Sequence, residues 1–217
     1  MRASAPLPAA PDRPARWTAL RRVLDHTGHL VLYLPAGYWP RGAELLSLAR
    51  RLLPEARDGR AGLARGRYRR PYLVDLRTAA PLPVDVNLSH SGDLVVVGVS
   101  RTARIGVDAE RTDRTIATGP TMLARFCDPA ERAWLATLDP GARVAEIARL
   151  WTCKEATAKA DGRGLGLDLR TVRVGGVPDP PVHAHPVELR PGDRYWVATA
   201  LLTDPPPVHG RTREEPT

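Results

Sequence analysis

The stretch WTCKEATAKADGRG, residues 151–164, contains the only two lysines of a chain that carries thirty arginines. Its small and apolar residues favour a helix, and the Asp161-Gly162 pair predicts where that helix ends. The ammonium of Lys154 or Lys159 is a compact point charge on a flexible stem, whereas a guanidinium is a broad planar fork. The two lysines therefore indicate either small, mobile cations beside Glu155 or an ordinary solvated helix face.

The patterns on either side of this stretch predict an α+β protein. The segment DPAERAWL starts a helix, because Asp128 is a good N-cap, Pro129 suits the first helical position and Glu131 completes a capping box. Helical spacing of apolar residues predicts further helices, and β-branched or extended segments predict strands. The predicted helices cover residues 43–56, 128–135 and about 143–160, and the predicted strands cover 29–35, 94–100, about 103–111, 165–174 and 194–202, with an extended segment after Pro71.

The chain also suggests a division into two halves. Each half offers a helix followed by strands that end in similar apolar runs, LVVVGVS and WVATALL, which indicates an internal duplication of low sequence identity. The Pro/Ala-rich residues 1–14 and the Pro-rich residues 204–217 are predicted to be disordered flanks. We therefore expect an N-terminal half over residues 15–103 and a C-terminal half over residues 104–203.

The chain has 217 residues and a formal net charge of +8, and its basic excess lies in its first part. Residues 1–80 hold fifteen arginines against six acids, a net of +9, whereas residues 81–217 hold seventeen Lys+Arg against eighteen acids, a net of −1. This asymmetry indicates an anionic ligand or partner. Aromatic residues make up only 5% and do not alternate with basic ones, so the stacking surface of a single-strand nucleic-acid binder is missing. We expect a small polyanion or an acidic protein as partner, and no nucleic acid.

Cysteine usage and hydropathy point to a cytoplasmic location. Cys127 and Cys153 have neither metal-ligand spacing nor a C-x-x-C arrangement, so a disulfide framework is not indicated. The apolar runs HLVLYLP and LVVVGV are far too short to span a bilayer, and the first residues lack the apolar core of a secretion signal. The sequence therefore predicts no association with a membrane.

The segment IGVDAE, residues 105–110, places Asp108 and Glu110 two residues apart on a predicted strand, so that both carboxylates project from the same face. Adjacent carboxylates repel and raise one another's pKa unless a cation lies between them. Mg²⁺ is the natural choice for oxygen ligands, and Glu155, in a small and apolar neighbourhood, is the best candidate for a third ligand. The alternative is the polar end of an edge strand whose acids pair with the arginines that follow.

The segment NLSHSG brings Ser89, His90 and Ser91 together in a predicted turn before a buried strand. Their hydroxyl and imidazole groups are donors suited to phosphate, and the alternative is a turn in which Asn87 and Ser89 cap their own backbone. The glycines of ADGRGLGLDL follow a helix rather than a strand, so no P-loop or dinucleotide fingerprint is present. Neither ATP nor NAD is indicated.

Taken together and in this order, NLSHSG, IGVDAE and WTCKEATAKADGRGL resemble the 4′-phosphopantetheinyl transferases of the Sfp type. The family pattern G-[IV]-D-x-E, followed further along the chain by W-[TS]-x-K-E-[AS]-x-x-K, matches residues 106–110 and 151–159. Residues 68–71, Tyr-Arg-Arg-Pro, fall where the family has Y-x-[KR]-P. The resemblance covers roughly residues 65–175, and three ordered motifs make it specific.

The resemblance implies a pseudo-dimeric α+β fold, in which two similar halves of one monomeric chain hold the active site in the cleft between them. It also implies coenzyme A as substrate and Mg²⁺ as cofactor. By matching position, Asp108, Glu110 and Glu155 would hold the metal. Glu155 and Lys159 would be catalytic, with Glu155 assisting deprotonation of the attacking serine.

The resemblance further implies which residues meet the cofactor's phosphates. The expected cofactor-binding residues are Lys154 and Lys159 at the pyrophosphate, and Arg70, Ser89 and His90 at the 3′-phosphate and adenine end. Many relatives have lysine where Arg70 stands, and its neighbour Arg69 leaves the register open by one residue. Glu131 matches a glutamate suggested as the base in some relatives, but its capping box is a sufficient explanation, so we place it outside the catalytic set.

The reaction implied by the resemblance is transfer of 4′-phosphopantetheine from coenzyme A to a serine hydroxyl of an apo acyl or peptidyl carrier protein, with release of 3′,5′-ADP. Carrier proteins are typically acidic, which suits the basic first part of the chain. One alternative is a non-catalytic relative that binds coenzyme A or a carrier protein, which would not require all three carboxylates. Another is a basic nucleic-acid-binding module, which would need neither Mg²⁺ nor coenzyme A.

Overall fold

The computed structural model describes residues 7–8, 14–38, 42–57, 59–112, 119–174 and 182–203. Its helices are α1 (Pro14–Thr27), α2 (Glu44–Leu52), α3 (Pro120–Phe126), α4 (Pro129–Ala136) and α5 (Pro140–Asp161), with 3₁₀ turns η1 (Pro54–Ala56), η2 (Arg67–Arg69), η3 (Gly164–Gly166) and η4 (Leu169–Thr171). Its strands are β1 (Leu7–Pro8), β2 (His29–Pro35), β3 (Ala61–Arg65), β4 (Pro71–Asp75), β5 (Asp85–Ser91), β6 (Leu94–Ser100), β7 (Arg104–Arg111), β8 (Val182–Glu188) and β9 (Arg194–Leu202).

The strands form two main sheets and a hairpin. The first sheet has the order β1-β2-β6-β5, and the second has the order β7-β9-β8, while β3 and β4 pair only with each other. All neighbours are antiparallel except β1 and β2. In each main sheet a strand (β2 or β7) is followed by a helix and two more strands, and the last of these lies in the middle. The α+β class expected from the sequence is confirmed.

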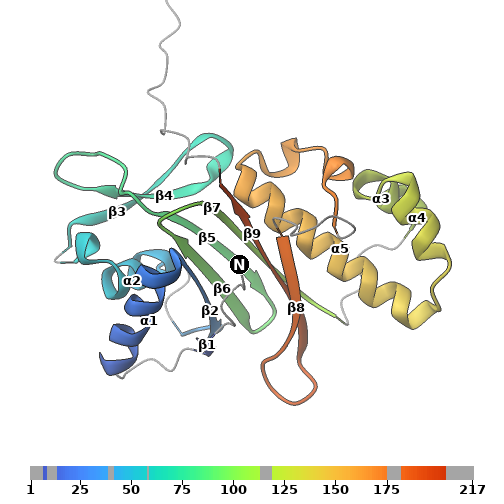
Figure 1. Ribbon diagram of the computed structural model, residues 1–217, viewed down its shortest axis with the longest axis horizontal. Coiled ribbons are helices and arrows are strands. Elements are labelled where there is room, and N and C mark those ends of the chain that lie inside the picture. Colours follow the sequence, from blue (N-terminus) through green and yellow to red (C-terminus); the bar gives the residue numbers. More distant parts are fainter. Residues whose placement is uncertain are drawn as a thin grey trace, which may run out of the picture.

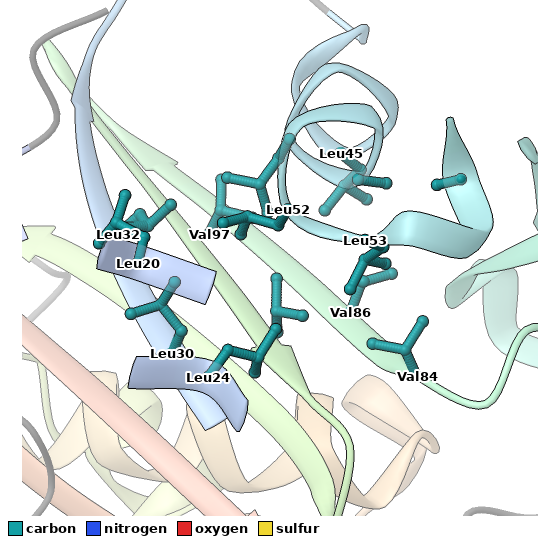
Figure 2. Packing of buried hydrophobic residues seen from close by; sticks show 14 of the residues in the cluster. Leu20, Leu24, Leu30, Leu32, Leu45, Leu52, Leu53, Val84, Val86 and Val97 are labelled. Carbon is teal, nitrogen blue, oxygen red and sulfur yellow. The ribbon is translucent and has the colours of Figure 1, made fainter. Parts of the chain in front are cut away.

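Apolar faces divide the molecule into layers. Helices α1 and α2 cover one side of the first sheet, and α5 runs along the second sheet on the far side of the molecule (Figure 1). Leucines of α1 and α2 pack against β2, β5 and β6, as Figure 2 shows for Leu24, Leu45 and Leu52. A second core lies between the two sheets, and α5 packs on the other face of the second sheet. The second sheet is therefore buried on both faces.

Helix α1 has no counterpart in the elements predicted from the sequence. Trp17, Leu20 and Leu24 are its buried residues, and they lie on one face at helical spacing. The arginines between these residues make the segment polar on average, so its short apolar stripe is not apparent from composition. Residues 7–8 pair with β2 although they belong to a flank predicted to be disordered, and the other predicted flank, residues 204–217, lies outside the described residues.

The predicted start of α4 and the predicted end of α5 are confirmed. Asp128 and Glu131 form the predicted capping box at α4. Helix α5 begins before the predicted Arg143, because Asp139 caps it through bonds from Gly141 N at 3.1 Å and Ala142 N at 3.0 Å. The same helix ends as predicted, at Gly162 with φ 91°.

One predicted strand is wrong, and one predicted turn begins later than expected. The predicted strand over residues 165–174 consists of the 3₁₀ turns η3 and η4, and Asp168 stabilises the second by accepting from Arg170 N at 3.1 Å. The third strand of this sheet is β8, which the sequence did not predict. The turn that the sequence predicts at Ser91-Gly92-Asp93 is confirmed, but Ser89 and His90, which the sequence also places in this turn, belong to β5.

No helix in the described part of the chain is long and apolar enough to cross a membrane.

Gly106 allows β7 to approach α5 closely. A β-carbon at this position would lie 1.9 Å from the carbonyl oxygen of Ala156 and 2.4 Å from the backbone nitrogen of Ala160. Both atoms belong to helix backbone, which cannot move aside as a flexible side chain can. Only glycine therefore lets the strand that carries Asp108 lie directly on the helix that carries Glu155.

We expect Gly106→Ala to lower the free energy of unfolding by about 3 kcal/mol, since the methyl group forces strand and helix apart. Denaturant titration followed by circular dichroism measures this. Gly141→Ala is the matched control: it lies in the first turn of α5, and the nearest atom to its added methyl is 3.6 Å away. That variant should be neutral or slightly more stable. Equal effects of the two substitutions would contradict the packing role of Gly106.

Candidate active site

Strand β7 presents two carboxylates to helix α5. Asp108 and Glu110 alternate with Val107 and Ala109, whose side chains lie in the core between the sheets. The carboxylates therefore point to the opposite face, where α5 packs. Asp108 is buried at 5% exposure, and Glu110 is half-buried. The prediction that the two share one face is confirmed.

Helix α5 contributes Glu155 and Lys159, which lie one turn apart on the same side of the helix. The pKa of Glu155 is raised, first by burial and then by the negative charge of Asp108, with a smaller contribution from Glu110; Lys159 opposes this rise. The charges of Asp108 and Glu110 thus act on Glu155 from the neighbouring strand. A carboxylate whose pKa is raised is a better proton acceptor near neutral pH.

Lys159 directly neutralises Asp108. Its Nζ donates to Asp108 Oδ1 at 2.7 Å and to Ser89 Oγ at 3.0 Å. The Lys159 side chain is 26% exposed, against 7% for that of Asp108. The ammonium therefore lies between the buried acids and the open side of the site, where it can contact an anionic ligand.

The acids have unused capacity for a cation. Asp108 Oδ2 and Glu155 Oε1 are buried and accept no hydrogen bond. Buried carboxylate oxygens without a donor are costly unless a cation or water meets them, and such oxygens are the ligands that Mg²⁺ prefers. Among the described residues, no three acidic, histidine or cysteine side chains lie close enough together to form a closed metal site. The donor chemistry thus fits a hard cation, although the carboxylates are spread more widely than a closed site requires.

Strands β5 and β7 lie side by side but belong to different sheets. Four alternate side chains of β5 accept hydrogen bonds from backbone N–H groups of β7, and we call this set the acceptor ladder. Because the acceptors are side chains, the two sheets are joined without merging into one. Its bonds run from Ile105 N to Asp85 Oδ2 at 2.7 Å, from Val107 N to Asn87 Oδ1 at 3.0 Å, from Ala109 N to Ser89 Oγ at 3.3 Å and from Arg111 N to Ser91 Oγ at 3.2 Å.

A cavity of about 270 Å³ opens beside Lys159. It lies between the β3–β4 hairpin, β5, the start of α2 and the end of α5. Its lining includes Arg65, Tyr68 and Arg69 from the hairpin, and Leu88 from β5. With Lys159 at one side and arginines at another, the cavity offers positive charge together with an apolar wall.

The connection between β3 and β4 has an unusual backbone at this cavity. Tyr68 and Arg69 have φ values of 60° and 62°, a left-handed conformation that costs non-glycine residues free energy. The turn is held by bonds from Arg69 N to Gly66 O at 3.0 Å and from Arg65 Nη1 to Arg69 O at 3.1 Å. The exposed side chain of Arg69 is therefore attached to a tightly bonded backbone at the edge of the cavity.

Arg70 makes several hydrogen bonds within the protein. Its side chain is 10% exposed. The guanidinium donates to the Lys159 carbonyl, to the Asp85 carboxylate and, at 3.0 Å, to the Ile105 carbonyl. These bonds tie β4 to α5, β5 and β7. Arg70 also lines the cavity, and these bonds come from Nη1 and Nη2 rather than from Nε, so its assignment to the cofactor's phosphate stays a prediction; Arg69 is the more exposed arginine of this pair.

Ser89 requires a correction. Its hydroxyl donates to Asp108 Oδ1 at 2.8 Å and accepts from Ala109 N and Lys159 Nζ, so its hydrogen-bonding capacity is filled. Ser89 therefore belongs to the acidic centre rather than to the 3′-phosphate end. His90 points the other way along β5 and bonds through Nε2 to Glu44 Oε1 at 3.1 Å. With its side chain 41% exposed, His90 stays a candidate for a phosphate contact.

Lys154 lies apart from the acidic centre. Its side chain is fully buried, and Nζ donates to Glu131 Oε2 at 2.9 Å, to Leu169 O at 2.9 Å and to Val172 O at 2.8 Å. Three acceptors use all three donors of the ammonium. We therefore correct the prediction that Lys154 faces the pyrophosphate: it fastens α5 to α4 and to the segment around η4.

Two features of the site had no clear signal in the sequence. Glu44 is 5% exposed at the start of α2 and reaches His90 across a large sequence separation. The acceptor ladder is the other, although the alternation of polar residues from Asp85 to Ser91 could have indicated it. Such alternation normally predicts a solvated strand face, but here the polar face meets another strand.

Comparison with known proteins agrees with this geometry. Residues 104–203 match the sequence model of the 4′-phosphopantetheinyl transferase superfamily. These residues comprise β7 and its carboxylates, α5 with Glu155 and Lys159, and the strands β8 and β9. The C-terminal half of the chain is therefore similar to the proteins of this superfamily.

Individual relatives extend the likeness. The 4′-phosphopantetheinyl transferase HetI of Nostoc sp. is 28% identical over 177 residues, which cover 76% of this chain and 73% of the relative. The 4′-phosphopantetheinyl transferase of Bacillus subtilis is 32% identical over 117 residues, which cover 52% of this chain and 48% of the relative. The chain is thus a homologue of enzymes, and it spans about half to three quarters of their length.

We expect Lys154→Met to lower the free energy of unfolding by about 3 kcal/mol, because it leaves the Glu131 carboxylate without its buried cation. A folded Lys154→Met protein should bind coenzyme A with wild-type affinity in calorimetry. Adding Glu131→Gln should restore part of the stability, and Arg170→Met, in an exposed pair with Asp168, is the control that should leave stability nearly unchanged. Loss of coenzyme A affinity in a stable Lys154→Met protein would contradict the purely structural role.

We expect Glu155→Gln to stabilise the metal-free protein at neutral pH. Because folding raises the pKa of Glu155 above its usual 4.5, the charged form destabilises the folded state as pH rises through the folded pKa. The gain should therefore disappear below about pH 4, and urea titrations in EDTA across pH test this. Glu55→Gln is the control of opposite sign, since the hydrogen bond from Arg101 lowers the pKa of Glu55. That variant should lose stability at neutral pH and regain it in acid.

Proposed function

We propose that this protein transfers the 4′-phosphopantetheine group of coenzyme A to a serine hydroxyl of an apo acyl or peptidyl carrier protein, with Mg²⁺ as cofactor and 3′,5′-ADP as the second product. The observation that carries the proposal is the acidic centre formed by Asp108, Glu110 and Glu155, with Lys159 between it and a basic cavity. The match of residues 104–203 to the transferase superfamily supports the same reaction.

The three carboxylates are the residues that would hold the metal. Asp108 and Glu155 each have a buried carboxylate oxygen that accepts no hydrogen bond, which supports this assignment. Glu110 completes a set of three acids. When bound, Mg²⁺ supplies charge neutralisation at the pyrophosphate. Lys159, which neutralises Asp108 here, lies close enough to offer its ammonium to the same phosphates once Asp108 has another partner.

Glu155 is the proposed proton acceptor. Its raised pKa suits it to take the proton from the attacking serine hydroxyl. The serine oxygen then forms a bond to the β-phosphorus, and the bond from that phosphorus to the oxygen of 3′,5′-ADP breaks. Negative charge collects on the departing oxygen, and Lys159, which contacts Asp108, is the proposed cation that offsets it.

The cavity beside Lys159 is the proposed site for the nucleotide end of coenzyme A. Arg65 and Arg69 supply positive charge for its phosphates, and Leu88 with Tyr68 offers apolar surface to the adenine. His90 is a further candidate for the 3′-phosphate. Arg70, which also lines the cavity, stays in this set, whereas Lys154 is left out because its three donors are used within the protein.

The two-half architecture is part of the proposal. The shared order of strands in the two main sheets supports an N-terminal half over residues 15–103 and a C-terminal half over residues 104–203. Two halves in one chain provide a cleft without a second subunit, so we propose a monomer. The basic first part suits an acidic carrier protein in the cytoplasm.

A non-catalytic protein that binds coenzyme A or a carrier protein is the second candidate. It is supported by the absence, among the described residues, of a closed metal site. Against it stands the retention of three facing carboxylates, because binding alone does not require a buried acid with a raised pKa.

Intact-mass analysis of an apo carrier protein incubated with this protein, coenzyme A and Mg²⁺ tests the reaction. We expect the carrier to gain one phosphopantetheine group, and Glu155→Gln or Asp108→Asn to slow the gain at least about 100-fold. EDTA should have the same effect. Glu146→Gln, which removes an acid from the opposite part of α5, is the control that should retain the rate. Coenzyme A binding without any gain on acyl and peptidyl carriers would favour the non-catalytic candidate.

A further inference from the structure

Two serines of the acceptor ladder make the same contact with two acids. Ser89 Oγ accepts from Ala109 N and donates to Asp108 Oδ1, at 3.3 Å and 2.8 Å. Ser91 Oγ accepts from Arg111 N and donates to Glu110 Oε2, at 3.2 Å and 3.3 Å. Each hydroxyl therefore links the carboxylate of one residue of β7 to the backbone N–H of the residue that follows it.

This repeated link limits the freedom of the carboxylates. An aspartate or glutamate side chain at the edge of a sheet otherwise chooses among several rotamers. Each serine oxygen accepts from a backbone N–H, so the carboxylate can turn away only by losing the hydrogen bond that the hydroxyl donates to it. Both serines are nearly inaccessible, at 6% and 5% exposure. Water cannot readily replace either serine at such a depth.

The origin of the serines adds to their effect. Both lie on β5, in the N-terminal half, whereas the acids they hold lie on β7, in the C-terminal half. The orientation of the acids consequently depends on how the two sheets are registered, and Asp85 and Asn87 extend the same register along β7.

We infer that Ser89 and Ser91 are positioning residues for the metal-binding carboxylates, through which the N-terminal half sets the affinity of the acidic centre for its divalent cation. The inference rests on the proposed function, because it takes Asp108 and Glu110 as metal ligands. It assigns to the polar alternation of β5 a role distinct from phosphate contact. Groups that hydrogen-bond to a metal ligand typically change metal affinity 10–100-fold when removed.

Ser91 provides the sharper test, since Ser89 also contacts Lys159. Ser91→Ala should weaken Mn²⁺ binding about tenfold, measured by the loss of the free-ion signal in electron paramagnetic resonance with coenzyme A present. The Mg²⁺ concentration for half-maximal carrier modification should rise by a similar factor, with a smaller change in the rate at saturating Mg²⁺. Ser91→Thr, which keeps the hydroxyl, should restore both values.

Ser100→Ala is the matched control. Ser100 is another buried serine, on β6, and accepts backbone hydrogen bonds from Thr102 and Ala103 away from the acids. It should lose stability while keeping wild-type Mn²⁺ affinity. Ser91→Cys, which keeps the packing and weakens the donor, replaces Ser91→Ala should that variant not fold.

The outcomes separate the inference from the proposed function. Unchanged Mn²⁺ affinity in Ser91→Ala or Ser91→Cys, beside normal binding by the wild type, overturns the positioning role alone. Equal weakening by Ser100→Ala also overturns it, because the effect is then one of general stability. If the wild type binds no Mn²⁺ with coenzyme A present, the metal assignment of the proposed function fails, and the positioning role fails with it.

Discussion

The donation of four β7 backbone N–H groups to four β5 side chains is the constraint on which the rest of the structure depends. A buried N–H must find an acceptor, and the edge of the second sheet finds its acceptors in side chains of the first. The backbone of β5 is thereby left to pair with β6. Two sheets can then pack face to face over a shared core while their edges stay joined, and the acids of β7 are held at the junction.

The contacts at this junction also explain how buried carboxylates are stabilised. Asp108 is offset by Lys159 and Ser89, whereas Glu155 keeps an oxygen without a donor, and burial raises its pKa. Burial of so much negative charge is unfavourable unless a cation is bound or nearby. The close approach of β7 to α5 at Gly106 brings these acids together.

The two lysines of the chain have different roles, and both roles depend on the compact shape of the ammonium group. Lys154 is fully buried and meets three acceptors from two segments, α4 and the residues around η4, and the planar fork of an arginine does not match that arrangement. Lys159 joins buried acids to a solvent-facing cavity, where a flexible stem lets the charge follow its partner. Elsewhere the chain uses arginine, as in Arg70, whose fork spans a carboxylate and two carbonyls.

The sequence by itself determined the elements and groups that follow from local rules. Period-two alternation placed Asp108 and Glu110 on one face, capping chemistry placed the start of α4 and the end of α5, and the order of motifs indicated the family before any contact was known. Tertiary structure decided what local rules do not encode: that Lys154 turns toward Glu131, that Arg70 bonds to α5, β5 and β7, and that β8 rather than residues 165–174 completes the second sheet. Side chains that share a motif can point to opposite sides of a helix, and only the packing around that helix determines which of them meets the ligand.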